Sequence, residues 1–151
     1  MQKAFERVKS SGYMTNWAAR LFARAIDRKL KEIGVASGQM PVFFALGDGA
    51  ALQQKKLAQI ASIEQPTMAA TLSRMERDGL IIRRPDPDDG RSQLVELTPA
   101  AMEKAALVKQ AGMAVHARAL EQLSDDERVL FLDMLGRVVS SLEGLLEEDP
   151  A

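Results

Sequence analysis

The chain has 151 residues, about the length of one domain, and contains no cysteine. It therefore has neither a disulfide framework nor thiol chemistry, and no apolar run reaches the ~18 residues of a membrane span. The formal net charge is −1, but residues 1–120 hold 18 Lys and Arg against 12 Asp and Glu. We expect a cytoplasmic protein without membrane partners. Its basic first 120 residues matter more for nucleic-acid binding than the overall charge does.

Two helices are predicted before residue 47. Apolar residues at helical spacing indicate a helix from about residue 15 to residue 33, followed by Gly34 as a stop. Residues 1–11 are ambiguous, because Ser10, Ser11 and Gly12 should break a helix there. Ser37 is expected to cap a second helix over residues 38–46, and residues 51–52 are expected to add a short strand.

A helix-turn-helix is predicted next. Leu57, Ile60 and Ala61 give a short apolar face, and residues 62–64 have the length of a turn. Pro66 suits the first turn of the second helix, because its missing N–H costs nothing there. Apolar residues at helical spacing form one face of this helix: Met68, Leu72 and Met75. Small and basic residues form the other: Thr67, Ala70, Ser73, Arg74 and Arg77. A plain helical hairpin with a solvated charged face is the alternative.

A β-hairpin is predicted after Gly79. Residues 80–82 and 93–97 read as strands, and residues 85–90 read as the turn between them. Arg91 lies just past the tip. A helix with a face of short residues, followed by a hairpin with arginine at its tip, is typical of a DNA-reading helix with a wing.

These motifs resemble the winged helix-turn-helix core of the MarR family of transcriptional regulators. The most specific pieces are EQPTMAATLSRMERDGLI, the hairpin RRPDPDDGRS and Leu97-Thr98. GYMTNWAARLFARAIDRKLKEIGV, GQMPVFFAL and LSDDERVLFLDMLGRV are similar to the family's flanking helices, so the resemblance covers roughly residues 12–145. The chain departs from the family at Ala69-Ala70, where many members carry Ser or Thr and then Arg.

Two long helices are predicted at the C-terminal end. Thr98 and Pro99 suit the start of an alanine-rich helix that reaches about residue 122, and Ser124 with Glu127 matches a capping box. The last helix carries an apolar stripe too wide for a small winged domain to cover, which we interpret as a surface for a second copy. A wholly intramolecular helical core is the alternative.

The expected fold is mainly α-helical with a small β-hairpin wing, in a single domain of residues 1–151. Residues 36–98 would form the winged helix-turn-helix region, and residues 12–34 and 99–147 the helical dimerisation region.

Enzymatic chemistry is not expected, because no catalytic constellation can be assembled. His116 is the only histidine, and no glycine-rich phosphate loop is present. The spacing of Asp86, Asp88 and Asp89 is wrong for a calcium loop. We expect no catalytic residue, no cofactor and no metal.

DNA contacts are expected from both helices and the wing. Lys55 and Lys56 suit phosphates, whereas Ala69 and Ala70 could pack on thymine methyl groups. Arg91 would enter the minor groove, oriented by a charge-assisted hydrogen bond that it donates to Asp89. The full set of predicted DNA-binding residues is Lys55, Lys56, Gln65, Pro66, Thr67, Ala69, Ala70, Ser73, Arg74, Arg77, Arg84, Asp89 and Arg91.

The expected function is sequence-specific transcription regulation by a homodimer on a pseudo-palindromic operator in double-stranded DNA. The resemblance implies repression, released by a small aromatic or phenolic ligand. The pocket for such a ligand could be lined by Tyr13, Trp17, Met40, Phe43 and Phe44. Each of these residues could instead belong to the ordinary hydrophobic core. The alternative function is a protein-interaction module, which an open face joining Arg74, Arg77 and Arg91 would argue against.

Overall fold

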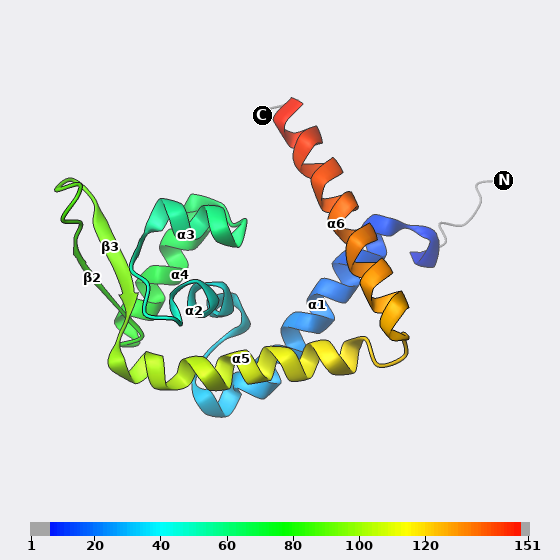
Figure 1. The fold of residues 1–151 in the computed structure, drawn as a ribbon, viewed down its shortest axis with the longest axis horizontal. Helices are drawn as coiled ribbons and strands as arrows, with labels where there is room; N and C mark the ends of the chain where they lie inside the picture. Colours follow the sequence, from blue (N-terminus) through cyan, green and yellow to red (C-terminus); the bar gives the residue numbers. More distant parts are fainter. Residues whose placement is uncertain (1–6, 149–151) are drawn as a thin grey trace. The chain divides into compact units, whose positions relative to one another are not determined.

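A computed structural model describes residues 7–148, and the expectations for residues 1–6 and 149–151 fall outside that range. The chain forms two compact units, Met1–Val115 and His116–Ala151, which are described in turn. Figure 1 shows the elements in chain order. Among the described helices, none is long and apolar enough to cross a membrane.

The first unit begins with the short 3-10 helix η1 (Arg7–Lys9) and the helix α1 (Ser11–Leu30). Helix α1 starts at Ser11, four residues before the predicted start at about residue 15. The expected break is present but confined to Ser10, whose backbone is extended (φ −91°, ψ 114°) between η1 and α1. The reason is a cap: Ser10 Oγ accepts a hydrogen bond from the Tyr13 N–H at 3.2 Å. The end agrees with the prediction, because Gly34 adopts φ +73° after the 3-10 helix η2 (Lys31–Ile33).

Ser37 does not cap the second helix. It opens the 3-10 helix η3 (Ser37–Gln39), which leads into α2 (Met40–Leu46). Its backbone N–H donates to Asp27 Oδ1 at 2.7 Å, while Gln39 Oε1 accepts from the Ala36 N–H at 3.0 Å. A carboxylate from α1 thus satisfies the N–H at Ser37, which a local sequence pattern could not reveal.

The helix-turn-helix and its wing follow. Helix α3 (Gln54–Ala61) contacts α4 (Gln65–Arg77), and α4 contacts β2 (Ile81–Pro85; Figure 1). The turn between α3 and α4 passes through Ser62 at φ 51°, and Gly79 at φ +72° follows the end of α4. Both residues have a left-handed backbone conformation, which costs glycine nothing and is uncommon for a residue with a side chain such as Ser62.

Three antiparallel strands form one sheet in the order β1-β3-β2, which includes β1 (Leu52–Gln53) and β3 (Gln93–Leu97). The register pairs Leu52 with Val95, and Pro85 with Gln93. The strand β2 begins one residue later than predicted and extends further, through Arg83 and Arg84 to Pro85, the first residue of the predicted turn. Proline is tolerated there since β2 is an edge strand. The predicted third strand at residues 51–52 is confirmed, one residue further along.

One apolar core lies under these elements. Met68, Leu72 and Met75 of α4 are fully buried, as their spacing predicts, and Thr71 is buried beside them. They pack with buried residues of the preceding helices and the sheet: Leu30, Val42, Phe43, Leu46, Leu57, Ile81, Val95 and Val108. Because this face of α4 is packed in the core, the opposite face of the helix is exposed to solvent.

Helix α5 (Pro99–Ala119) begins at the predicted cap, where Thr98 Oγ1 accepts from the Ala101 N–H at 3.2 Å. The Thr98 hydroxyl also donates to the Gly79 carbonyl at 2.8 Å, which fastens α5 to the end of α4. Helix α5 ends at Ala119, three residues before the predicted end. At Gly112 an added Cβ would lie 2.9 Å from Met40 Cε, so this glycine allows α2 to approach closely.

The second unit contains α6 (Asp125–Glu148). The predicted capping box is confirmed: the Ser124 N–H donates to Glu127 Oε2 at 2.8 Å, and the Glu127 N–H donates to Ser124 Oγ at 3.3 Å. No described residue of α6 is buried, although many are large and apolar. The mainly helical fold with a small antiparallel sheet confirms the predicted fold class.

Candidate nucleic-acid interface

The exposed face of α4 is small and polar at its beginning and basic toward its end. Thr67, Ala70 and Ser73 are exposed there, followed by Arg74 and Arg77, while Gln65 and Pro66 are exposed in the first turn. Ala69 is half-buried at the edge of this face. Side chains this short let a helix approach the base edges in a major groove closely.

The first turn of α3 and the wing border one open hollow of about 520 Å³. Lys55 lines it from α3, and Arg83 and Arg91 line it from the hairpin. Lys56 is exposed next to Lys55. Lys55, Arg83 and Arg91 therefore border one hollow, an arrangement suited to a phosphate backbone.

Several arginines of the predicted interface already have carboxylate partners. Arg77 Nε lies 3.0 Å from Asp78 Oδ1, and Arg84 Nε lies 3.1 Å from Glu96 Oε2. Exposed ion pairs of this kind contribute little to stability, so phosphate oxygens can replace the carboxylates at small cost. Both arginines therefore lie at the surface and can exchange their carboxylate partners for phosphate oxygens.

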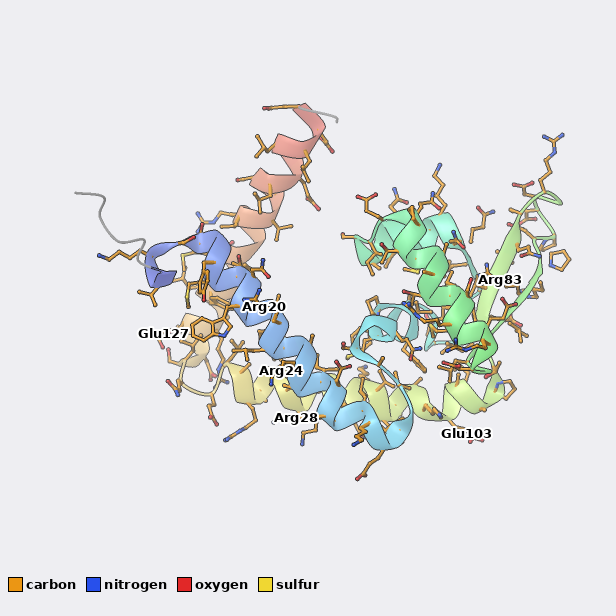
Figure 2. The ribbon with its side chains drawn as sticks, turned by 180° about the vertical axis from the view of Figure 1, so that it is seen from behind. Arg20, Arg24, Arg28, Arg83, Glu103 and Glu127 are labelled. Carbon is orange, nitrogen blue, oxygen red and sulfur yellow. The ribbon has the colours of Figure 1, made fainter. Side chains whose placement is uncertain are left out.

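Arg83 was not among the predicted DNA contacts, and it has a different position. Arg83, labelled in Figure 2, has the most covered side chain of the ion-paired arginines within residues 7–148. Its Nε lies 3.2 Å from Glu76 Oε2. This ion pair joins β2 to α4. It therefore connects the wing to the helix whose exposed face carries Arg74 and Arg77.

Asp89 hydrogen-bonds to Arg91, as the prediction that it orients Arg91 requires, but the bond involves the backbone of Arg91. Its Oδ1 accepts a hydrogen bond from the backbone N–H of Arg91 at 3.1 Å. Within residues 7–148, no ion pair joins the Arg91 guanidinium to a carboxylate. Asp89 thus shapes the turn that carries Arg91 and leaves the exposed guanidinium unbridged.

Asp86 was missed by sequence reasoning as a residue that organises the interface. Its carboxylate is only 7% exposed and accepts from Gln53 Nε2 at 2.7 Å and from the Asp88 N–H at 2.9 Å. These bonds, the one from Gln53 above all, hold the pKa of Asp86 below its ordinary value of 3.8. The aspartate-rich turn was a visible signal, but nothing in the local sequence points to Gln53.

The depressed pKa predicts how Asp86 contributes to stability. Since the folded-state pKa lies below 3.8, the contribution is complete above that value and is lost as the pH falls through the folded-state pKa. Asp86→Asn should therefore lower the free energy of unfolding by a constant amount from about pH 5 to about pH 8. The difference from the wild type should shrink below pH 3.8. Denaturant titrations of both proteins across this range measure it, and a difference that grows in acid would contradict it.

The residues predicted to line an effector pocket fall into two groups. Met40 and Phe43 are buried in the core, whereas Trp17 and Phe44 are exposed. The rings of Tyr13 and Trp17 lie edge to face with centroids 6.1 Å apart. Met40 and Phe44 both face Gly112 of α5. An effector site that uses these residues stays a prediction.

A second basic surface lies on α1. Arg20, Arg24 and Arg28 follow one another at intervals of four residues along this helix (Figure 2). All three are exposed, as expected of a solvated face, and Arg20 donates to Asn16 Oδ1 at 3.4 Å.

Comparison with known proteins gives one consistent result. The sequence profile of the MarR family matches residues 33–92. The chain is 31% identical to the transcriptional regulator HosA of Escherichia coli O111:H- over 103 residues, which cover 68% of this chain and 76% of HosA.

Solved structures agree. A probable transcriptional regulator from Pseudomonas aeruginosa is 26% identical, with a TM-score of 0.79 over 88% of this chain and 99% of that one. The transcriptional repressor CouR, bound to a 23-mer DNA duplex, is 25% identical, with a TM-score of 0.78 over 92% of this chain and 99% of CouR.

Proposed function

Since this chain belongs to the MarR family, which comprises transcriptional regulators and not enzymes, we propose that it binds operator DNA as a homodimer and represses transcription. The likeness to CouR supports the proposal, because CouR is a transcriptional repressor whose structure was solved bound to a DNA duplex. A regulator of this kind works on the chromosome, so we place it in the cytoplasm.

The observation that carries the proposal is the exposed face of α4. Its short side chains precede Arg74 and Arg77, and its opposite face is locked into the core by Met68, Leu72 and Met75. A helix held in this way presents one face to a major groove without rotating. The alternative, a protein-interaction module, does not require short residues and arginines in this order.

The proposed contacts divide by type. Arg74 reads a base edge, and Ala69 and Ala70 pack on thymine methyl groups. Lys55 and Lys56 contact phosphates beside α4, and Arg91 enters the flanking minor groove. The remaining predicted residues support these contacts from the same surfaces: Gln65, Pro66, Thr67, Ser73, Arg77, Arg84 and Asp89.

Selection of bound fragments from random double-stranded DNA tests the proposal. We expect a two-fold symmetric motif whose half-sites lie about 10 base pairs apart, because a dimer places two α4 helices in successive major grooves. Arg74→Ala is the matched control and should lose the preference at one symmetric pair of positions. Selection that enriches no motif would leave the protein-interaction module as the better assignment.

We further propose that a small aromatic or phenolic acid weakens DNA binding. The family resemblance and the aromatic residues of α1 and α2 support this proposal. The ligand should raise the melting temperature of the free protein and lower operator affinity together, since it stabilises a form that binds DNA poorly. A panel of such acids measured in both assays tests it, and a panel without effect in either would end the proposal for this class.

A further inference from the structure

The carboxylate of Asp86 lies where the paired part of the hairpin ends and its loop begins. The strand register closes at Pro85 and Gln93, and one more backbone bond, from the Asp86 N–H to the Ser92 carbonyl, follows at 3.1 Å. Burying an ionised carboxylate is costly unless hydrogen bonds compensate it. Asp86 is nevertheless buried, whereas Asp88 and Asp89 of the same loop are exposed.

The bonds of Asp86 connect segments that are distant in sequence. Gln53, its closest partner, lies 33 positions earlier and is the N-cap residue of α3. Gln53 Nε2 also donates to Ser92 Oγ at 3.0 Å, and Ser92 Oγ lies 3.4 Å from Asp86 Oδ2. The three side chains therefore join both ends of the hairpin loop to the first turn of α3, where Lys55 and Lys56 lie.

The loop beyond this junction is held together by its own bonds. The Asp88 N–H donates to Asp86 Oδ1 at 2.9 Å, the Ser92 N–H donates to the Asp89 carbonyl at 3.0 Å, and the Arg91 N–H donates to Asp89 Oδ1. These bonds hold the loop residues together, so the direction of the loop depends on how its base is attached. Strand β1, which leads directly into α3, pairs with β3 at two positions, Leu52 with Val95 and Gln53 with Leu94.

We propose that Asp86 and Gln53 form a positioning clamp that sets the direction of the wing tip, and with it the preference of Arg91 for narrow, A·T-rich flanking minor grooves. The inference rests on the proposed DNA-binding function and deepens it. The clamp touches no DNA. It fixes the distance between the phosphate contacts on α3 and the minor-groove contact on the wing, which must both fit the same duplex.

The direction in which Asp86→Asn changes DNA affinity distinguishes a positioning role of Asp86 from an effect of its charge. Asp86→Asn removes a negative charge near the DNA, which by electrostatics alone should strengthen binding. It also leaves one acceptor oxygen where Asp86 uses two, Oδ2 for Gln53 Nε2 and Oδ1 for the Asp88 N–H, so the two bonds cannot both be kept as they are and the clamp is weakened. Positioning therefore predicts weaker binding. Asp88→Asn is the matched control, because it removes the same charge two residues away on an exposed side chain and should leave affinity unchanged or raise it.

The experiment measures affinity for operators with A·T-rich and G·C-rich flanks. We expect Asp86→Asn to weaken binding to the A·T-rich operator by about tenfold and to bring both operators to similar affinity. Combined with Arg91→Ala, it should cause no further loss, because both changes remove the same contact. Losses that multiply, or an Asp86→Asn variant that binds as tightly as the wild type, would overturn the clamp.

A double variant with the two side-chain types exchanged distinguishes loss of the clamp from unfolding of the protein. In Gln53→Glu with Asp86→Asn, the asparagine amide can donate to the new carboxylate, so the junction is restored with its polarity reversed. The A·T-flank preference should return in this double variant. A swapped variant that melts like the wild type without that preference would also overturn the clamp. Wild-type protein without any sequence preference would instead contradict the proposed function, which keeps the two failures distinct.

Discussion

Leu142→Glu should abolish the stable dimer. Leu142 is 55% exposed in the single chain and lies in the middle of an apolar stripe along α6. A dimer formed through this stripe would bury two unpaired carboxylates, each at a cost of about 2 kcal/mol or more. The dissociation constant should rise by about a thousandfold, and operator binding should fall with it. Sedimentation over a range of protein concentrations measures the change.

Ser140→Glu is the control for this prediction. It introduces the same carboxylate two residues earlier on the opposite, exposed side of α6 and should leave the dimer intact. The core of the first unit includes no residue of α6, so circular dichroism should still detect the folded winged region in Leu142→Glu. A dimer of wild-type affinity in Leu142→Glu would show that the stripe is not the interface.

The interior elements of the winged region could be predicted because their apolar residues follow one period. Met68, Leu72 and Met75 repeat at helical spacing, and all three are buried. The turn positions were predictable as well, since Gly34 and Gly79 occupy left-handed conformations that disfavour side chains. The capping box at Ser124 was predictable because both of its partners lie within four residues of each other.

Helix ends and hydrogen bonds between residues distant in sequence were harder to predict from the sequence. Ser10 both ends η1 and caps α1, and the sequence alone does not show that the next helix begins directly after it. Ser37 looked like a cap, but its N–H donates to Asp27, ten residues earlier. The clamp between Gln53 and Asp86 depends on the strand register, which no local pattern contains.

Arg91→Ala should weaken binding to every operator and lower its salt dependence. Arg91 is exposed at the wing tip, and none of its guanidinium atoms forms an ion pair within residues 7–148. In the minor groove it would respond to groove width and phosphate potential more than to base identity. The loss should therefore be largest with A·T-rich flanks. The slope of log affinity against log salt should fall by about two, one phosphate equivalent per subunit.

Arg74→Ala should fail differently, and the contrast assigns the two elements. Arg74 lies on the exposed face of α4, where a base contact discriminates by roughly 1–3 kcal/mol per site. Its removal should relax specificity at one symmetric pair of operator positions while affinity still responds to the flanks. Affinity against salt, measured for both variants on operator and flank-substituted DNA, distinguishes these outcomes. If Arg91→Ala left affinity and slope unchanged, the wing would not contact DNA, and the minor-groove reading would have to be assigned to another part of the chain.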